Sequence, residues 1–181
     1  MSDDTPATEE HDEVVDDTTP EPEELYGQSV TWSRGQAVLH VGRDQLTDVV
    51  RTLRDGEGFN VCIDVTAVDY LTYSSPRALP EGVEAERFEI VVNLLSHEHR
   101  SRLRIRVQVP ESDPSCPTLF DVHPGTEALE REVYDMFGIR FDGHPDLSRI
   151  LMPEDWEGHP LRKDYAVGRI PVQFKGVVNE R

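Results

Sequence analysis

The 181-residue sequence contains only two cysteines, Cys62 and Cys116, which lie far apart and form no Cys-x-x-Cys spacing. Two isolated thiols argue against a disulfide framework and provide no ligand set for an iron–sulfur cluster on this chain. The sequence also lacks a phosphate-binding glycine loop and a Gly-x-Gly-x-x-Gly motif, and its one internal repetition is a pair of Gly-His-Pro triplets. No nucleophile with an adjacent base is apparent either.

Long apolar runs and positive charge are also scarce. No stretch approaches the roughly 20 apolar residues that span a bilayer, and the N-terminus has neither the basic start nor the apolar run of a signal peptide. The sequence has 18 Lys and Arg against 36 Asp and Glu, a formal net charge of −18. Nucleic acid is therefore not expected as a partner, because phosphate contacts need concentrated positive charge. We expect a chain that is cytosolic or peripheral to a membrane.

The acidic residues are concentrated at the N-terminus. Residues 1–25 carry eleven Asp or Glu, no Lys or Arg, and few large apolar side chains. Such a segment cannot bury enough surface to offset the entropy of ordering, so we predict a disordered acidic tail over 1–25. The tail is either simply solvated or competes for a basic patch on a partner.

The rest of the sequence predicts an α+β domain over 26–125, followed by a helix and an extended docking segment over 126–181. The predicted elements are a strand at 37–41, a helix with its N-cap at Asp44, a strand at 59–68, a loop at 70–86, a central strand at 88–95 and a strand at 102–109. Together they predict a mostly antiparallel sheet of three or four strands with the helix on one face. Residues 170–181 are expected to be an extended tail that lies on a neighbour.

The last predicted strand carries a row of guanidinium groups, from Arg102, Arg104 and Arg106, opposite an apolar face. One interpretation is cross-strand pairing with acids such as Glu89 on the preceding strand. The other is docking of this arginine strand on an acidic surface of another subunit.

A second helix is predicted from Thr126, a suitable N-cap, to Gly138, a residue that commonly ends helices. Its apolar face contains Leu129, Val133, Met136 and Phe137. Glu132 is spaced among these residues, where a carboxylate needs a partner, and the basic residues Arg149, Arg162 and Lys163 are candidates. Alternatively, Glu132 lies at the helix edge and reaches into water.

The segment from His144 to Tyr165 combines stiff corners, charges and apolar anchors. About twenty residues with little regular structure inside a compact domain are normally functional or disordered. The apolar residues of this segment, Leu147, Ile150, Leu151, Met152 and Trp156, would form an exposed patch if the segment lay free in water. We therefore predict that a partner orders it, and that its charges pair across the boundary.

The histidines suggest an alternative hypothesis, that the chain is a metal-dependent enzyme. His97 and His99 would lie on one side of a strand, as a ligand pair does, but no third ligand follows at a recognised spacing, and a solvated turn is the other interpretation. His144 and His159 each precede a proline. Their imidazoles either cap backbone groups or share a metal or a proton-relay role.

Five runs between residues 130 and 165 carry a family resemblance: Glu130-Arg131-Glu132, Asp135-Met136-Phe137-Gly138, Gly143-His144-Pro145-Asp146-Leu147, Arg149-Ile150-Leu151 and Glu157-Gly158-His159-Pro160-Leu161-Arg162-Lys163-Asp164-Tyr165. They resemble the signature of the C subunit, the 30 kDa-type subunit, of bacterial NADH:quinone oxidoreductase, respiratory complex I. The resemblance is close from 124 to 165 and looser from 38 to 109. The sequence departs at Ala128, where the family often has an aromatic residue, and at Ser148, where it often has a basic one.

The resemblance implies a cofactor-free structural and assembly protein of the complex, located peripherally on the cytoplasmic side of the plasma membrane. Its expected partners are the quinone-site subunit and the cluster-bearing subunit, known as the D and B subunits, and it meets the membrane only through the complex. The complex uses NADH, FMN, iron–sulfur clusters and quinone, and it translocates protons. The alternative within the superfamily is the equivalent subunit of a membrane-bound hydrogenase or of a complex with another electron donor. The residues expected to dock on partners are Glu130, Arg131, Glu132, Asp135, His144, Arg149, Trp156, His159, Arg162, Lys163 and Asp164.

Overall fold

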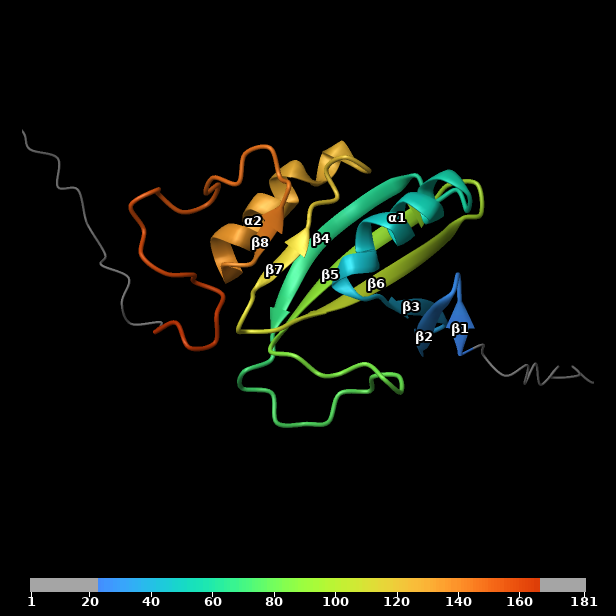
Figure 1. The fold of residues 1–181 in the computed structure, drawn as a ribbon, viewed down its shortest axis with the longest axis horizontal. Helices are drawn as coiled ribbons and strands as arrows, with labels where there is room; N and C mark the ends of the chain where they lie inside the picture. The colour runs from blue at the N-terminus through green and yellow to red at the C-terminus, as the bar shows by residue number, and fades with distance from the viewer. Residues whose placement is uncertain (1–22, 167–181) are drawn as a thin grey trace, which may run out of the picture.

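The computed structural model describes residues 23–166, which form one mixed sheet, two α-helices and a small two-stranded ribbon (Figure 1). The predicted extended tail at 170–181 lies outside the described residues, as do residues 1–22 of the predicted acidic tail. Glu24 and Leu25 are within the predicted acidic tail, but the structure pairs them with the next strand as part of the sheet.

The elements in chain order are β1 (Glu24–Leu25), β2 (Gln28–Ser33), β3 (Gln36–His40), α1 (Leu46–Asp55), β4 (Val61–Asp69), β5 (Phe88–Ser96), β6 (Ser101–Val109), β7 (Ser115–Pro117), α2 (Glu127–Phe137) and β8 (Arg140–Asp142). Short 3-10 helices at Arg43–Gln45 and Pro124–Thr126 precede α1 and α2. The sheet order is β1-β2-β3-β6-β5-β4, and β7 pairs with β8. The β3–β6 and β7–β8 pairs are parallel, and the other pairs are antiparallel.

Alternation along the central strands separates a buried apolar face from a polar one. Val92 of β5 lies opposite Val65 of β4 and Ile105 of β6, and all three are buried. Leu46, Val50 and Leu53 of α1 pack into the same core, as do Val133, Met136 and Phe137 of α2. This arrangement confirms the predicted α+β class. Residues on both sides of the predicted division at 126 share the core.

Several details of the sheet differ from the sequence expectation. The described sheet has six strands rather than three or four, because β1, β2 and the crossover that brings β3 beside β6 have no strong alternation signal. Asp44 makes no side-chain cap, since it lies inside the 3-10 helix before α1. Within the predicted strand at 59–68, Ile63 is 45% exposed because the register of β4 against β5 shifts between Cys62 and Asp64.

The polar face of the sheet is partly covered by the loop at 70–87. Glu89 is fully buried there, where it accepts hydrogen bonds from the Tyr70 hydroxyl at 3.1 Å and from the Gln108 amide at 2.5 Å. Arg106 Nε lies 3.4 Å from Glu89 Oε1, and Arg77 lies 3.8 Å from the other oxygen. The predicted pairing of the arginine strand with Glu89 is thus confirmed for Arg106. Within residues 23–166, no helix has the length and apolar character needed to cross a membrane.

Candidate functional site

The carboxylate of Glu130, in the first turn of α2, lies in the core rather than on the surface. Its side chain is fully buried. It accepts hydrogen bonds from the Thr118 hydroxyl, from the Leu119 N–H at 2.7 Å and from the Thr126 hydroxyl at 3.0 Å. Burial raises the pKa of Glu130 above its ordinary value even though these hydrogen bonds favour the carboxylate. Glu130 therefore fixes the turn before α2 from inside the protein.

For the Glu132 side chain the sequence allows two interpretations, a buried carboxylate with a basic partner or a solvent-exposed one. The structure exposes its side chain, so the helix-edge interpretation is correct and the expected pairing with Arg149, Arg162 or Lys163 is wrong. The reason is the helical phase: the buried carboxylates of α2 are Glu130 and Asp135, which flank the apolar stripe. Thr126 also differs from its expected role, because its hydroxyl binds Glu130 instead of capping the helix backbone.

Arg131 connects α2 to the irregular segment that follows β8. Its guanidinium donates to the Ser148 carbonyl at 3.1 Å, to the Ser148 hydroxyl at 2.9 Å and to the Arg149 carbonyl at 3.1 Å. Ser148, one of the two departures from the family pattern, therefore provides a side-chain acceptor. Arg131 also lies 3.7 Å from Glu127 one turn earlier.

Asp135 is the principal anchor of the segment. Its carboxylate is fully buried and accepts the backbone N–H groups of Ile150, Leu151 and Met152 at 3.1, 2.8 and 2.8 Å. The Arg149 guanidinium lies 2.5 Å from the other oxygen and also donates to the Trp156 and Gly158 carbonyls. Burial opposes ionisation of Asp135, but the three N–H groups and Arg149 outweigh it, so its pKa is below the ordinary value.

The segment also completes the C-terminal end of α2, where helix carbonyls lack partners within the helix. The Asp135 carbonyl accepts from His159 Nδ1 at 3.0 Å, and the Met136 carbonyl accepts from the Leu161 N–H at 3.0 Å. The Arg162 guanidinium donates to the carbonyls of the last helical residue, Phe137, and of Gly138. Gly138 ends the helix as predicted, in the left-handed conformation with φ of 71°.

A further contact reaches from the segment to the end of β4. The Lys163 N–H donates to Asp69 Oδ2 at 2.9 Å, and Arg87 pairs with both Asp69 and Asp164 at 3.0 and 2.9 Å. Asp69 is buried, but its hydrogen bonds from Arg87 and from two backbone N–H groups hold its pKa below the ordinary value. The Lys163 side chain is exposed. Asp69 and Arg87 were not predicted from the sequence, because nothing local to them signals a partner almost 100 residues away.

The remaining predicted site residues have structural contacts. His144 Nε2 lies 3.1 Å from the Glu127 carbonyl, and its Nδ1 accepts the Asp146 N–H at 3.1 Å. His144 and His159 thus bind backbone groups, which is the capping interpretation given from the sequence. The Trp156 ring is half-buried, and its indole N–H finds no acceptor within residues 23–166. His97 and His99 lie in the turn between β5 and β6.

These contacts change the expectation for the segment from His144 to Tyr165. The sequence predicts that a partner orders it, whereas the structure fixes it by contacts with α2 and β4 of its own chain. Arg149 and Arg162 donate hydrogen bonds to groups of their own chain. Three large apolar side chains of the segment nevertheless remain exposed: Ile150 at 40%, Leu151 at 59% and Leu161 at 48%. Over residues 23–166, no cluster of three or more His, Cys, Asp or Glu side chains is arranged to hold a metal.

The family model for the 30 Kd subunit of respiratory-chain NADH dehydrogenase matches residues 39–170, which include the whole of this site. The chain belongs to this family. The matched range begins inside β3 and extends past Tyr165, so it contains both the buried anchors and the exposed apolar residues of the segment. The resemblance noted from the sequence is confirmed.

Curated relatives agree with this membership. The C subunit of the NADH-quinone oxidoreductase of Saccharopolyspora erythraea is 45% identical over 150 residues, which are 81% of this chain and 56% of that protein. The corresponding C subunit of Nocardia farcinica is 46% identical over 145 residues, which are 79% of this chain and 53% of that protein. The chain thus spans little more than half the length of these 30 Kd subunit relatives.

Two solved structures share the fold of this 30 Kd family member. The trypsin-resistant fragment (1-134) of Nqo5 is 38% identical, with a TM-score of 0.58, and the match covers 67% of this chain and 90% of that one. A chain of the membrane-bound sulfane sulfur reductase, an archaeal respiratory membrane complex, has a TM-score of 0.63 at 23% identity, covering 85% of this chain and 90% of that one. The second likeness shows the fold alone.

Proposed function

We propose that this chain is a structural and assembly subunit in the hydrophilic arm of a proton-translocating NADH:quinone oxidoreductase. It carries no cofactor itself, and the NADH, FMN, iron–sulfur clusters and quinone of the complex are held by other subunits. The family match over residues 39–170 supports this proposal. The likeness to a sulfane sulfur reductase complex concerns the fold, so NADH as the donor is supported by the curated relatives and not by the architecture.

One structural observation carries the proposal: the segment from His144 to Tyr165 is rigidly held from inside while it exposes apolar side chains outside. The Asp135 carboxylate fixes the backbone of residues 150–152, and the side chains of Ile150 and Leu151 at this turn remain 40% and 59% exposed. Buried polar anchors of this kind preorganise a surface and so lower the entropy lost when it binds. Exposed large apolar residues on such a surface are typical of protein interfaces.

Charged side chains around these apolar residues are available to a partner. Glu132 and Lys163 are exposed, and neither side chain makes an ion pair with any of residues 23–166. We propose that they pair with charges of a neighbouring subunit and fix the register of docking more than its affinity. Glu130, Arg131, Asp135, Arg149, His159 and Arg162 contribute indirectly in this view, because they shape the docking surface without touching the partner.

We further propose that the docking partners are the quinone-site subunit and the cluster-bearing subunit, the D and B subunits of the complex. In this arrangement the chain lies peripherally on the cytoplasmic side of the plasma membrane and meets the membrane only through the complex. This placement rests on the family membership.

The experiment is co-purification through a tag on the full chain, expressed in place of the natural subunit. We expect the double variant Leu151→Ser, Leu161→Ser to lose the co-eluting cluster-bearing subunits while the chain itself stays folded. Leu71→Ser is the matched control, since Leu71 is as exposed as Leu161, at 48%, but lies on the loop after β4. The complex recovered with the unmodified chain should catalyse NADH-dependent quinone reduction.

Two results would contradict the proposal. A normal yield of complex with reduced activity per complex in the Leu151→Ser, Leu161→Ser variant would indicate a role in the reaction instead of assembly. A purified complex that contains the chain but does not oxidise NADH would remove the proposed electron donor while leaving the assembly role intact.

A further inference from the structure

Three arginines lie at one end of the sheet, far from the docking segment in sequence. Arg34 is in the turn between β2 and β3, Arg100 is in the turn between β5 and β6, and Arg102 is near the start of β6. Across residues 23–166 none of these three guanidinium groups makes an ion pair or a hydrogen bond. We call Arg34, Arg100 and Arg102 the arginine surface.

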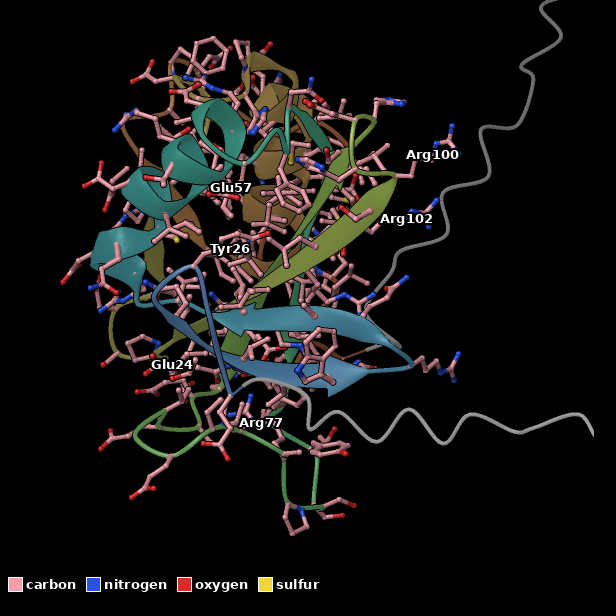
Figure 2. All side chains as sticks on the ribbon, turned by 90° about the vertical axis from the view of Figure 1, so that its right-hand side faces the viewer. Glu24, Tyr26, Glu57, Arg77, Arg100 and Arg102 are labelled. Carbon is pink, nitrogen blue, oxygen red and sulfur yellow. The ribbon has the colours of Figure 1, made fainter. Side chains whose placement is uncertain are left out.

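The parallel pairing of β3 with β6 brings these residues together. Val38 lies opposite Arg104, so the start of β3 lies beside the start of β6. Arg100 and Arg102 line a groove of about 540 Å³ together with Gly35 and Gln36, the residues that follow Arg34. Figure 2 shows the Arg100 and Arg102 side chains on the same side of the molecule, directed away from its body.

In the described part of the chain, no neighbouring acid forms an ion pair with the arginine surface: Glu98 shares the turn with Arg100, but its carboxylate lies beside Gly58. Arg104 donates to the Asn93 side chain at 3.2 Å, and Arg106 pairs with Glu89. Asp64 is the acid that lines the adjoining hollow with Arg102 and Arg104, and it forms no ion pair with either. Arg34 and Arg100 also have positive φ angles of 53° and 50°, a conformation that glycine or asparagine adopts more readily. The two turns therefore place arginine where the backbone alone favours another residue.

The strongest source of negative charge in the chain begins close to this surface. Residues 1–22 contain nine Asp or Glu and no Lys or Arg. The described chain starts at Glu23, whose carbonyl accepts the Val30 N–H at 2.9 Å. Because β1 is antiparallel to β2, the direction from Leu25 to Glu24 is the direction in which β2 continues to Ser33 and Arg34. Arg34 is four residues after Val30, a distance of roughly 13 Å along a strand, whereas 22 residues can reach roughly 70 Å.

We propose that the acidic segment of residues 1–22 binds the arginine surface of its own chain. A tether of this length gives an effective concentration on the order of mM, so even weak charge pairing keeps the surface occupied at low salt. This occupancy is intramolecular and does not depend on the function proposed above.

The test is paramagnetic broadening in the full chain. A spin label is attached at Thr8→Cys in a Cys62→Ser background, and Cys116 stays unlabelled because it is fully buried. At about 0.01 M salt, where the screening length is ~30 Å, we expect loss of the amide signals of residues 33–36 and 100–102. At about 1 M salt, where the screening length is ~3 Å, those amide signals should return. The broadening should be independent of protein concentration.

Matched variants separate charge pairing from chance proximity. The signals at low salt should return in the triple variant Arg34→Gln, Arg100→Gln, Arg102→Gln. They should also return when the six acids from Glu9 to Asp17 are replaced by their amides. Arg51→Gln, an exposed arginine on α1 paired with Asp48, should leave the broadening unchanged. No broadening at low salt, broadening that survives the triple variant, or broadening that grows with concentration would each overturn the proposal. The last result would make a second copy of the chain the occupant.

Discussion

The carboxylate of Asp135 and the guanidinium of Arg149 form an ion pair in which the aspartate side chain has no exposure and the arginine retains 15%. The same aspartate accepts three successive backbone N–H groups, so one side chain at the end of α2 determines the shape of the following turn. Asp135 therefore couples the stability of α2 to that of the irregular segment. Variants of the residues in and around this contact should reveal the coupling.

Removal of the charge on Asp135 is the first such variant. Asp135→Asn removes the counter-ion of Arg149 and replaces one carboxylate oxygen by an NH2 donor, which must face either Arg149 or the N–H groups of residues 150–152. We therefore expect a loss of about 3–5 kcal/mol in unfolding free energy. Urea denaturation measures it. Asp142→Asn is the control, because Asp142 is 64% exposed, and it should change stability by less than about 0.5 kcal/mol. Equal small effects in both variants would show that Asp135 does not anchor the segment.

The second prediction concerns pH. The folded pKa of Asp135 is below its ordinary value of 3.8, so its stabilising contribution is complete above that pH and is lost as the pH falls through the folded pKa. The stability difference between the natural chain and Asp135→Asn should therefore be constant from neutral pH down to about 4 and then shrink. A difference that shrinks already between pH 7 and 5 would contradict this assignment.

Glu130 should act in the opposite direction, as a third prediction. Burial raises its folded pKa above the ordinary 4.5, so the cost of its ionised form is present above the folded pKa and is relieved as the pH falls toward 4.5. Glu130→Gln should remove this acid-side gain, which is read from the pH dependence of the urea midpoint. An unchanged pH profile in Glu130→Gln would argue that the carboxylate is solvated.

The fourth prediction compares the effects of variants at two adjacent residues of α2, Arg131 and Glu132. Arg131→Ala should destabilise the turn at 148–149, because it removes the donor to two carbonyls and to the Ser148 hydroxyl. Glu132→Gln should leave unfolding within about 0.5 kcal/mol, since its side chain is exposed. Hydrogen exchange on the isolated chain measures the first effect through the amides of Ile150 to Met152, which should be slow in the natural chain and faster in Arg131→Ala. Fast exchange in the natural chain would restore the expectation that a partner orders the segment.

The fifth prediction compares alanine variants at two glycines that have the same φ angle. Gly138 and Gly27 both have φ of 71°, but a Cβ at Gly138 would lie 2.5 Å from His159 Nε2 and 2.6 Å from an Arg162 nitrogen, whereas at Gly27 it meets nothing within 4 Å. Gly138→Ala should therefore destabilise more than Gly27→Ala, with the excess reporting displacement of His159 and Arg162. Thermal unfolding of both variants tests this, and similar losses would mean that the two side chains move aside freely.

The sequence predicts most of the local structure and much less of the pairing between distant residues. Alternation identifies β4 and β6, a run that is apolar on both faces identifies β5, and apolar spacing identifies both helices, because these signals depend only on neighbours in the chain. The position of β3 beside β6 depends on contacts between residues 66 apart, such as Leu39 and Ile105, which no local pattern encodes.

The candidate site divides in the same way. The charged residues of the segment are recognisable from composition and family resemblance, but which of them is buried depends on the phase of α2. Glu132 is the acid spaced among the apolar residues in the sequence, whereas the buried carboxylates of the folded helix are Glu130 and Asp135. The partners of Asp69 follow from tertiary packing alone.

The parallel pairing of β3 with β6 also sets an order of events during synthesis. Leu39 leaves the ribosome 66 residues before Ile105, which is about 3–13 s at roughly 5–20 residues per second. Until β6 emerges, the hairpin of β2 and β3 has no neighbour on its inner edge, and the loop that must close is long. The nascent chain thus carries an unpaired strand edge throughout the synthesis of α1, β4 and β5, and a chaperone that shields strand edges would act in that interval.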